Sequence, residues 1–248
     1  MLSALPPLGS YIHLPVDASM RQNILLSLRG KKLHDSTAYL LARSHTLNLR
    51  RPHRQVENIE TDDGDRITIN WEVSKFQGKN ITAERVYEAM LFFVGMQEII
   101  ISEKLDQLSI RESDAVPDDQ LDVDQIRLVT RHNDGILSEK NIVMYSEFFP
   151  NPESVKQPYG VLVSDSIDQD DAFPYQTQSR LRRDIVSANM VIELEPGVVS
   201  LVQWTLAKIY SSPLVSEATL DRLSRDSLDP YFVTMLQVMR EQLGISEY

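Results

Sequence analysis

Residues 185–210, IVSANMVIELEPGVVSLVQWTLAKIY, decide the fold of this chain. In Ile185–Leu194 one set of side chains alternates with another, which is the pattern of a strand with one buried face. Glu195-Pro196-Gly197 predicts a turn, because proline presets φ and glycine accepts the positive φ that follows. Val198–Tyr210 then returns as a second strand. Strands of this length predict the central, curved part of a sheet that wraps around something.

Composition limits the classes of function. The formal charge of −11 argues against nucleic acid as the main partner, because phosphate binding needs a concentrated Lys/Arg surface. The chain has no cysteine, which excludes disulfide frameworks and Cys-based zinc sites and favours a reducing compartment. Met1–Val16 lacks the features of a secretory signal, and no run of about 18 apolar residues predicts a membrane span. We therefore expect a cytoplasmic protein, with a nuclear location left open.

Residues 1–53 are predicted to form an N-terminal extension with helices that begin near Met20. Four leucines recur there at seven-residue spacing, namely Leu26, Leu33, Leu40 and Leu47. A leucine zipper shows such spacing. Gly30, however, costs about 1 kcal/mol in mid-helix relative to alanine, which favours two short helices packed on the body. The basic run at 50–54 follows the leucines and is broken by Pro52, whereas a DNA-reading basic region precedes its zipper as a continuous helix.

The middle of the chain predicts a mostly antiparallel sheet. Gln55–Val73 is expected to be a β-hairpin, because Asp63-Gly64 is a strong turn signal. Further strands are predicted from alternation and from β-branched residues at Gln125–His132, Ile142–Phe149 and Tyr159–Ile167. Two short segments before them, Ile99–Ser102 and Leu105–Arg111, are also expected to be β-strands. Short turns connect these strands, as in a meander.

Two helical regions accompany the predicted sheet. Thr82 can cap a helix that runs to Val94 with one apolar face. Residues 213–246 predict a helical C-terminus, in which Asp229 is the cap and Pro230 the first residue of a long amphipathic helix. Such a helix must pack its apolar side chains against the sheet.

This order of elements resembles the helix-grip fold of START-like domains in the Bet v 1-like (SRPBCC) superfamily, and is similar to START-like domains of oomycete proteins. The resemblance covers about Arg54–Gly244. It is carried by the helix Thr82–Val94 after the first hairpin, by ILSEKNIV at 136–143, and by the strand pair of residues 190–194 and 202–206. Lys140-Asn141 departs from the family, which usually has Arg-Asp there.

The resemblance implies an α+β fold, with a curved antiparallel sheet wrapped around the C-terminal helix and extra N-terminal helices. It also implies a START-like domain over residues 54–248 and a cavity between sheet and helix. Burying apolar surface there contributes about 25 cal/mol per Å². We expect the lining to consist of Trp71, Met144, Tyr145, Val163, Met190, Trp204, Phe232, Met235 and Met239. The polar end of a ligand is expected at Arg127, Arg131 or His132. The alternative is that the same apolar residues fill a solid core.

The sequence carries no signature of catalysis. Its five histidines lack metal-ligand spacing, and neither a glycine-rich phosphate loop nor a nucleophile elbow occurs. We therefore predict no catalytic residue, metal site or cofactor, and expect a non-enzymatic carrier or sensor of a hydrophobic small molecule or lipid. Transient membrane contact and a homodimer stay open. One alternative is a protein-interaction or regulatory domain without a working pocket. Another is a small cyclase-like or hydrolase-like enzyme that uses a polar residue in the pocket.

Overall fold

The computed structural model describes residues 8–112, 123–152, 156–226 and 228–245. The helices are α1 (Ala18–Ser44), α2 (Ala83–Gly95), α3 (Gln97–Leu105), α4 (Glu217–Asp226) and α5 (Leu228–Leu243). The strands are β1 (His13–Leu14), β2 (His53–Glu60), β3 (Arg66–Gln77), β4 (Leu108–Arg111), β5 (Val123–Arg131), β6 (Leu137–Phe149), β7 (Tyr159–Ser166), β8 (Gln169–Asp170), β9 (Leu181–Glu195) and β10 (Val198–Ile209). None of these helices combines the length and apolar character needed to cross a bilayer.

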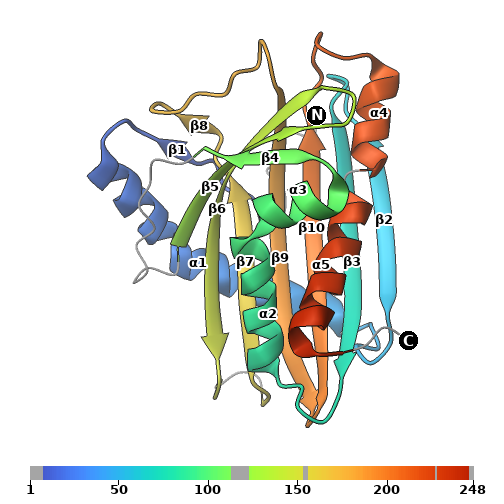
Figure 1. The fold of residues 1–248 in the computed structure, drawn as a ribbon. Coiled ribbons are helices and arrows are strands. Elements are labelled where there is room, and N and C mark those ends of the chain that lie inside the picture. Colours follow the sequence, from blue (N-terminus) through green and yellow to red (C-terminus); the bar gives the residue numbers. More distant parts are fainter. Residues whose placement is uncertain (1–7, 113–122, 153–155, 227, 246–248) are drawn as a thin grey trace.

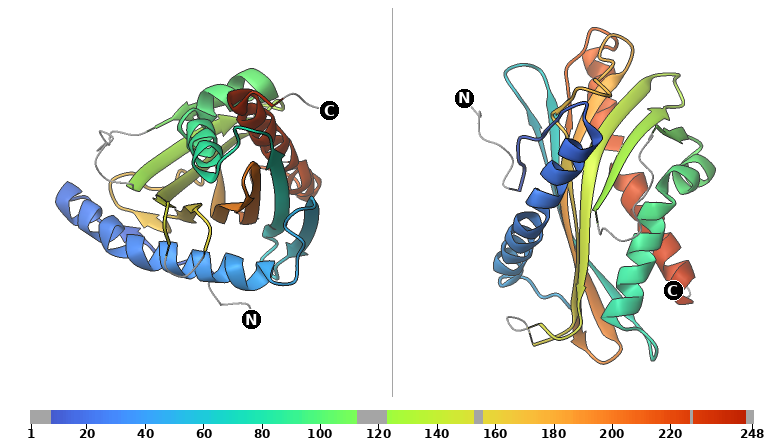
Figure 2. Two further views of the ribbon diagram at one scale, coloured as in Figure 1. Left: turned by 90° about the horizontal axis from the view of Figure 1, so that it is seen from below. Right: turned by 90° about the vertical axis from the view of Figure 1, so that its left-hand side faces the viewer.

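The large sheet has eight strands in the order β2-β3-β10-β9-β7-β6-β5-β4. Neighbouring strands in this order are antiparallel, and a short parallel contact adds β9 to the start of β6. Helices α2, α3 and α5 lie over one face of the sheet, which we call the α5 face, and α1 crosses the opposite face, the α1 face (Figures 1 and 2). The fold class predicted from the sequence is confirmed.

The central hairpin forms as predicted, with β9 and β10 in the middle of the sheet. Trp204 pairs with Ala188 on β9 and with Trp71 on β3. Gly197 in the connecting turn has φ of +79°, and a Cβ at this position would lie 2.8 Å from the carbonyl oxygen of Gly78. The amide of Gly78 donates to the carbonyl oxygen of Gly197 at 3.0 Å. A close approach of two backbones therefore requires glycine at residue 197.

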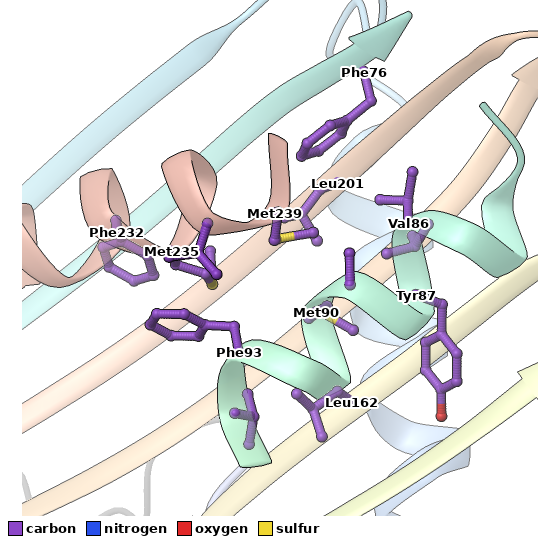
Figure 3. Packing of buried hydrophobic residues seen from close by; sticks show 14 of the residues in the cluster. Phe76, Val86, Tyr87, Met90, Phe93, Leu162, Leu201, Phe232, Met235 and Met239 are labelled. Carbon is purple, nitrogen blue, oxygen red and sulfur yellow. The ribbon is translucent and has the colours of Figure 1, made fainter. Parts of the chain in front are cut away.

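The α5 face carries one of the two main hydrophobic clusters. Met90 and Phe93 of α2 and Phe232, Met235 and Met239 of α5 are buried there against the sheet (Figure 3). Thr82 caps α2 as predicted, since its hydroxyl accepts a hydrogen bond from the amide of the third residue of the helix. The C-terminal helix thus lies over the sheet, as the helix-grip arrangement requires.

Helix α1 covers the second cluster, on the α1 face. Leu25, Leu33 and Leu40 are buried there. Lys32 forms a buried ion pair with Asp165 on β7, which ties the middle of the helix to the sheet. The predicted break near Gly30 is wrong, because α1 is continuous over 27 residues. Packing on the sheet stabilises the helix beyond its intrinsic propensity.

Two other local predictions are corrected. The isoleucine-rich segment predicted as a strand at Ile99–Ser102 belongs to helix α3. Ile100 and Ile101 are buried there while Ile99 is exposed, so tertiary packing overrides the preference of β-branched residues for strands. Helix α5 begins at Leu228, which places the predicted cap, Asp229, inside its first turn.

Candidate functional site

A cavity of about 120 Å³ lies between the α5 face and the helices that cover it. Most of its wall is apolar. Helices α2, α3 and α5 contribute Met90, Val94, Ile101, Tyr231, Phe232 and Met235, and the sheet contributes Leu128, Ile142, Met144, Leu162 and Ile185. Four of these residues, Met90, Phe232, Met235 and Leu162, are labelled in Figure 3, where they lie between α2 and α5 and on the sheet beneath them. The site is therefore built from both layers of the fold.

The floor of the cavity contains a row of polar side chains on the central strands. Ser187 and Asn189 come from β9 and Gln203 from β10. The hydroxyls of Ser187 and Ser164 are 2.7 Å apart, and the Gln203 amide donates to the Asn189 side-chain oxygen at 2.9 Å. The Gln203 side-chain oxygen is buried and accepts no hydrogen bond from a described residue. It can therefore accept a hydrogen bond from a bound molecule.

Two basic residues also line the cavity, Lys140 from β6 and Arg183 from β9. The Lys140 ammonium donates to the side-chain oxygen of Gln97 at 3.3 Å. Burial, reinforced by the charge of Arg183, lowers the pKa of Lys140 to about 7. Burial also lowers the pKa of Arg183 to about 10. One acidic residue, Glu139, also borders the cavity, but its carboxylate pairs with Arg127 and Arg180. The cavity thus has a positively charged region in a mostly apolar lining.

No protein-family profile matches the sequence, and no curated protein matches it significantly. Solved structures match at low identity. The human StarD13 (DLC2) lipid transfer and protein localization domain is 8% identical, with 83% of this chain and 94% of that chain covered and a TM-score of 0.45. For human STARD10 the identity is 9%, the coverage 95% and 84%, and the TM-score 0.47. The antiparallel sheet with a helix across one of its faces is the helix-grip fold expected from the sequence. The predicted resemblance is confirmed for the fold alone.

The helix-grip arrangement brings three of the nine predicted lining residues to the cavity. Met144 on β6 and Phe232 and Met235 on α5 line it. Met239 is buried in the same cluster, one turn further along α5, but does not reach the cavity wall. The residues of α5 that line the cavity thus lie on the apolar side of the helix that the amphipathic pattern predicts.

The other five predicted lining residues lie on the α1 face, under helix α1. They are Trp71, Tyr145, Val163, Met190 and Trp204. Their assignment to the cavity is corrected, because side chains alternate between faces along a strand. In four of the five cases an adjacent residue lines the cavity instead, namely Met144, Leu162, Asn189 and Gln203. The two tryptophans and Tyr145 thus lie on the α1 side, and the cavity side of the central hairpin carries the polar Asn189 and Gln203.

The three residues predicted to bind the polar end of a ligand do not line the cavity either. Arg127 is buried on the α1 face and forms ion pairs with Glu139 at 3.0 Å and with Glu112 at 3.6 Å. His132 is within hydrogen-bonding distance, 2.8 Å, of the Ser138 hydroxyl, and Arg131 is exposed. Arg127 and Arg131 lie on the face of β5 opposite Ile126 and Leu128, as alternation along a strand predicts.

Sequence reasoning missed Lys140, Arg183 and Gln203. A signal for Gln203 was present. Polar residues recur at every second position of the central hairpin, at Ser187 and Asn189 on one strand and at Gln203 and Thr205 on the other, between apolar neighbours. Such a polar row within a buried hairpin indicates a face that borders a ligand or a polar network. Among the described residues, no group of His, Asp and Glu is arranged to hold a metal ion.

Proposed function

We propose that this protein binds a hydrophobic small molecule or lipid in the cavity beneath α5, as a non-enzymatic carrier or sensor. The observation that carries the proposal is the composition of the cavity wall. Apolar side chains from both layers surround a few convergent polar groups, which is the usual make-up of a small-molecule site. The apolar wall would contribute affinity, and the polar row at Asn189 and Gln203 would orient the ligand.

The size of the cavity implies that the layers separate when a ligand binds. Ligand pockets usually measure about 300–1,000 Å³, whereas this cavity measures about 120 Å³. Helices α3 and α5 are joined at the surface by an ion pair between Lys104 and Glu241, which are both accessible to solvent. Exposed ion pairs of this kind contribute about 0–1 kcal/mol, so outward movement of either helix is not opposed by a strong contact there.

Mass spectrometry of the purified protein tests this proposal. Native spectra and organic extracts are expected to show a co-purifying apolar molecule, and the protein stripped of it should take up the neutral apolar dye Nile red. Met235→Trp should reduce dye uptake because it fills the cavity, whereas Val233→Trp, on the exposed side of the same helix, should not. Absence of both extracted lipid and dye uptake would refute the carrier function and leave an interaction domain without a working pocket.

A second candidate, a small enzyme, is favoured by Lys140 alone. An amine whose pKa is lowered to about 7 is partly neutral at physiological pH and can act as a base or nucleophile. The test is turnover of medium-chain p-nitrophenyl esters. Catalysis requires a rate above that of buffer which disappears in Lys140→Met, and equal rates for the two proteins would rule out this role for Lys140.

A further inference from the structure

The two basic residues of the cavity have no acidic partner. Neither Lys140 nor Arg183 forms an ion pair with any described residue. The Arg183 Nε is buried and donates no hydrogen bond to a described residue. Within the described part of the chain, the Lys140 ammonium contacts the neutral oxygen of Gln97 and, 5.9 Å away, the ring of Tyr231.

The other arginines near this part of the sheet that are not exposed are compensated. Their partners are carboxylates in four ion pairs, Arg111 with Glu98, Arg127 with Glu139, Arg180 with Glu112 and Arg182 with Asp184. Arg182 and Arg183 are neighbours on β9, so their side chains leave opposite faces of the sheet. Arg182, on the α1 face, pairs with Asp184, whereas Arg183, on the cavity side, has no such partner among the described residues. Lack of a partner is thus specific to the cavity.

Lys140 and Arg183 are both half-buried. Taking an unpaired cation partly out of water is costly, because a low-dielectric interior does not replace the water that the charge has lost. Arginine cannot relieve this cost by losing its proton at physiological pH. Two such cations in one cavity also repel each other. The pKa of Lys140 is lowered first by burial and further by the charge of Arg183. An anion placed between them would relieve both costs at once.

We propose that the ligand of this cavity is an apolar molecule with one anionic head, a carboxylate or a phosphate, bound by Arg183 and Lys140. This inference rests on the binding function proposed above and specifies its ligand class. A guanidinium can donate two parallel hydrogen bonds to either kind of head, and the ammonium adds a second positive charge. The apolar body then contacts Ile185, Met144 and Met235, which line the same cavity.

Three probes with the same ten-carbon chain separate the contribution of the head from that of the chain. Calorimetry with decanoate, decyl phosphate and decanol, on protein stripped of lipid, should show at least one anion binding about tenfold or more tighter than the alcohol, since a charged hydrogen-bonded pair is worth about 1.5–3 kcal/mol. The carboxylate and phosphate arms show which head fits better. Lys140→Met combined with Arg183→Met should abolish the preference and retain decanol binding.

Arg131→Met is the matched control, because Arg131 is an exposed arginine on β5 that does not line the cavity. It should leave all three affinities unchanged. The double variant should also melt at the same or a higher temperature than the wild type, because it removes uncompensated charges. A fall of several degrees would show that the two cations are structural, and would overturn the inference.

The pH dependence of decanoate binding gives an independent readout. The groups around Lys140 are Gln97 and Glu98 on α3, Arg111 on β4, Arg183 on β9 and Tyr231 on α5. Glu98 is paired with Arg111 and favours the charged lysine only weakly. Decanoate stays ionised above pH 6, so its affinity should fall several-fold between pH 6 and 9 as Lys140 loses its proton, while decanol affinity stays constant.

Failure of this inference can be told from failure of the binding function. Equal affinities of decanol, decanoate and decyl phosphate would overturn the anionic head and leave the carrier function intact. Binding of none of the three, together with no extracted lipid and no Nile red uptake, would overturn both.

Discussion

Glu139 and Arg127 illustrate how this protein uses charge inside its sheet. The Glu139 carboxylate is fully buried and accepts hydrogen bonds from Arg127 at 3.0 Å, from Arg180 at 3.4 Å and from the amide of Gln176. Arg127 carries both features expected of a ligand contact, charge and burial, yet its carboxylate partners satisfy it. Its role is to tie β5 to β6 and to the segment before β9.

Replacing Glu139 should therefore affect stability and leave ligand binding unchanged. Glu139→Gln removes one of the two carboxylates that Arg127 and Arg180 share. Because Glu112 still pairs with both arginines, the loss should be that of a hydrogen bond to a charged group, about 1.5–3 kcal/mol. Urea denaturation measures this loss. Nile red uptake by the folded variant should equal that of the wild type. A variant of unchanged stability would show that the network contributes nothing to folding.

His132 should make the protein sensitive to acid. Burial, with the charge of Arg183 as the next cause, lowers the pKa of His132 from 6.5 to about 4. Because the folded state disfavours the proton, His132 contributes stability above pH 6.5, and this contribution is lost as the pH falls from 6.5 to about 4. The shift corresponds to about 3 kcal/mol.

The difference between wild type and His132→Gln isolates this effect, since other titrating groups are common to both proteins. The free energy of unfolding, measured at intervals from pH 7 to pH 4, should fall more steeply in the wild type than in the variant. Parallel curves would mean that His132 is not held neutral in the folded state.

At the scale of elements, helix α1 shows where local preference misleads. Gly30 predicted a break, but the glycine lies on the exposed side of a continuous helix whose buried leucines pack on the sheet before and after it. A Cβ at Gly30 would have no atom within 4 Å. The glycine thus weakens the helix without serving a contact.

Gly30→Ala should stabilise the protein by about 1 kcal/mol, the difference in helix propensity between the two residues. The change appears as a higher denaturation midpoint with an unchanged slope. A decrease in stability would indicate that the helix bends at Gly30 in a way that alanine cannot follow. Gly197→Ala, at the crowded turn of the central hairpin, is the contrasting control and should destabilise.

Helices α3 and α5 must separate if a ligand larger than the 120 Å³ cavity is to bind. Because the chain has no cysteine, Lys104→Cys with Glu241→Cys can be joined by a short, reducible bis-thiosulfonate linker. We expect Nile red uptake to slow by about tenfold or more and to recover on reduction, as for a gated site.

The same linker placed within one helix, at Lys31→Cys and Asp35→Cys on α1, is the control and should have no effect. Equal uptake by the linked and the reduced α3–α5 variant would show that ligands reach the cavity by another route.

At the scale of the whole molecule, the antiparallel sheet and the helix over it could be predicted, but which face borders the cavity could not. Alternation along β9 and β10 separates Met190 and Trp204 from Asn189 and Gln203 correctly. Both faces are buried, however, one by α1 and the other by α2, α3 and α5, so hydrophobicity marks neither as the ligand side. The large apolar set was therefore assigned to the cavity. Lys140 and Arg183 are far apart in the sequence, and only the contact between β6 and β9 in the sheet brings them to one cavity. The sequence therefore did not indicate that they act together.

The division of the chain at residue 53 remains a prediction, and the placement of α1 bears on it directly. Trp71 and Trp204 are almost fully buried on the α1 face, and the ring of Tyr39 on α1 packs edge-on against both indoles, with its centroid 6.4 Å and 5.5 Å from theirs. Without residues 1–53 this face would be exposed as a contiguous apolar patch, which soluble monomers rarely show. A chain of residues 54–248 should therefore aggregate or lose its near-ultraviolet circular dichroism.

A chain that begins at residue 8 is the matched control for this deletion and should behave like the full protein, because it keeps α1 and the segment before it. Size-exclusion chromatography and circular dichroism distinguish the outcomes. If residues 54–248 gave a soluble monomer with the native spectrum, the helix-grip unit would fold without α1, and the helix would be an attachment to it. If they aggregate, α1 is a third layer of a single folding unit, because the sheet needs cover on both faces to remain in solution.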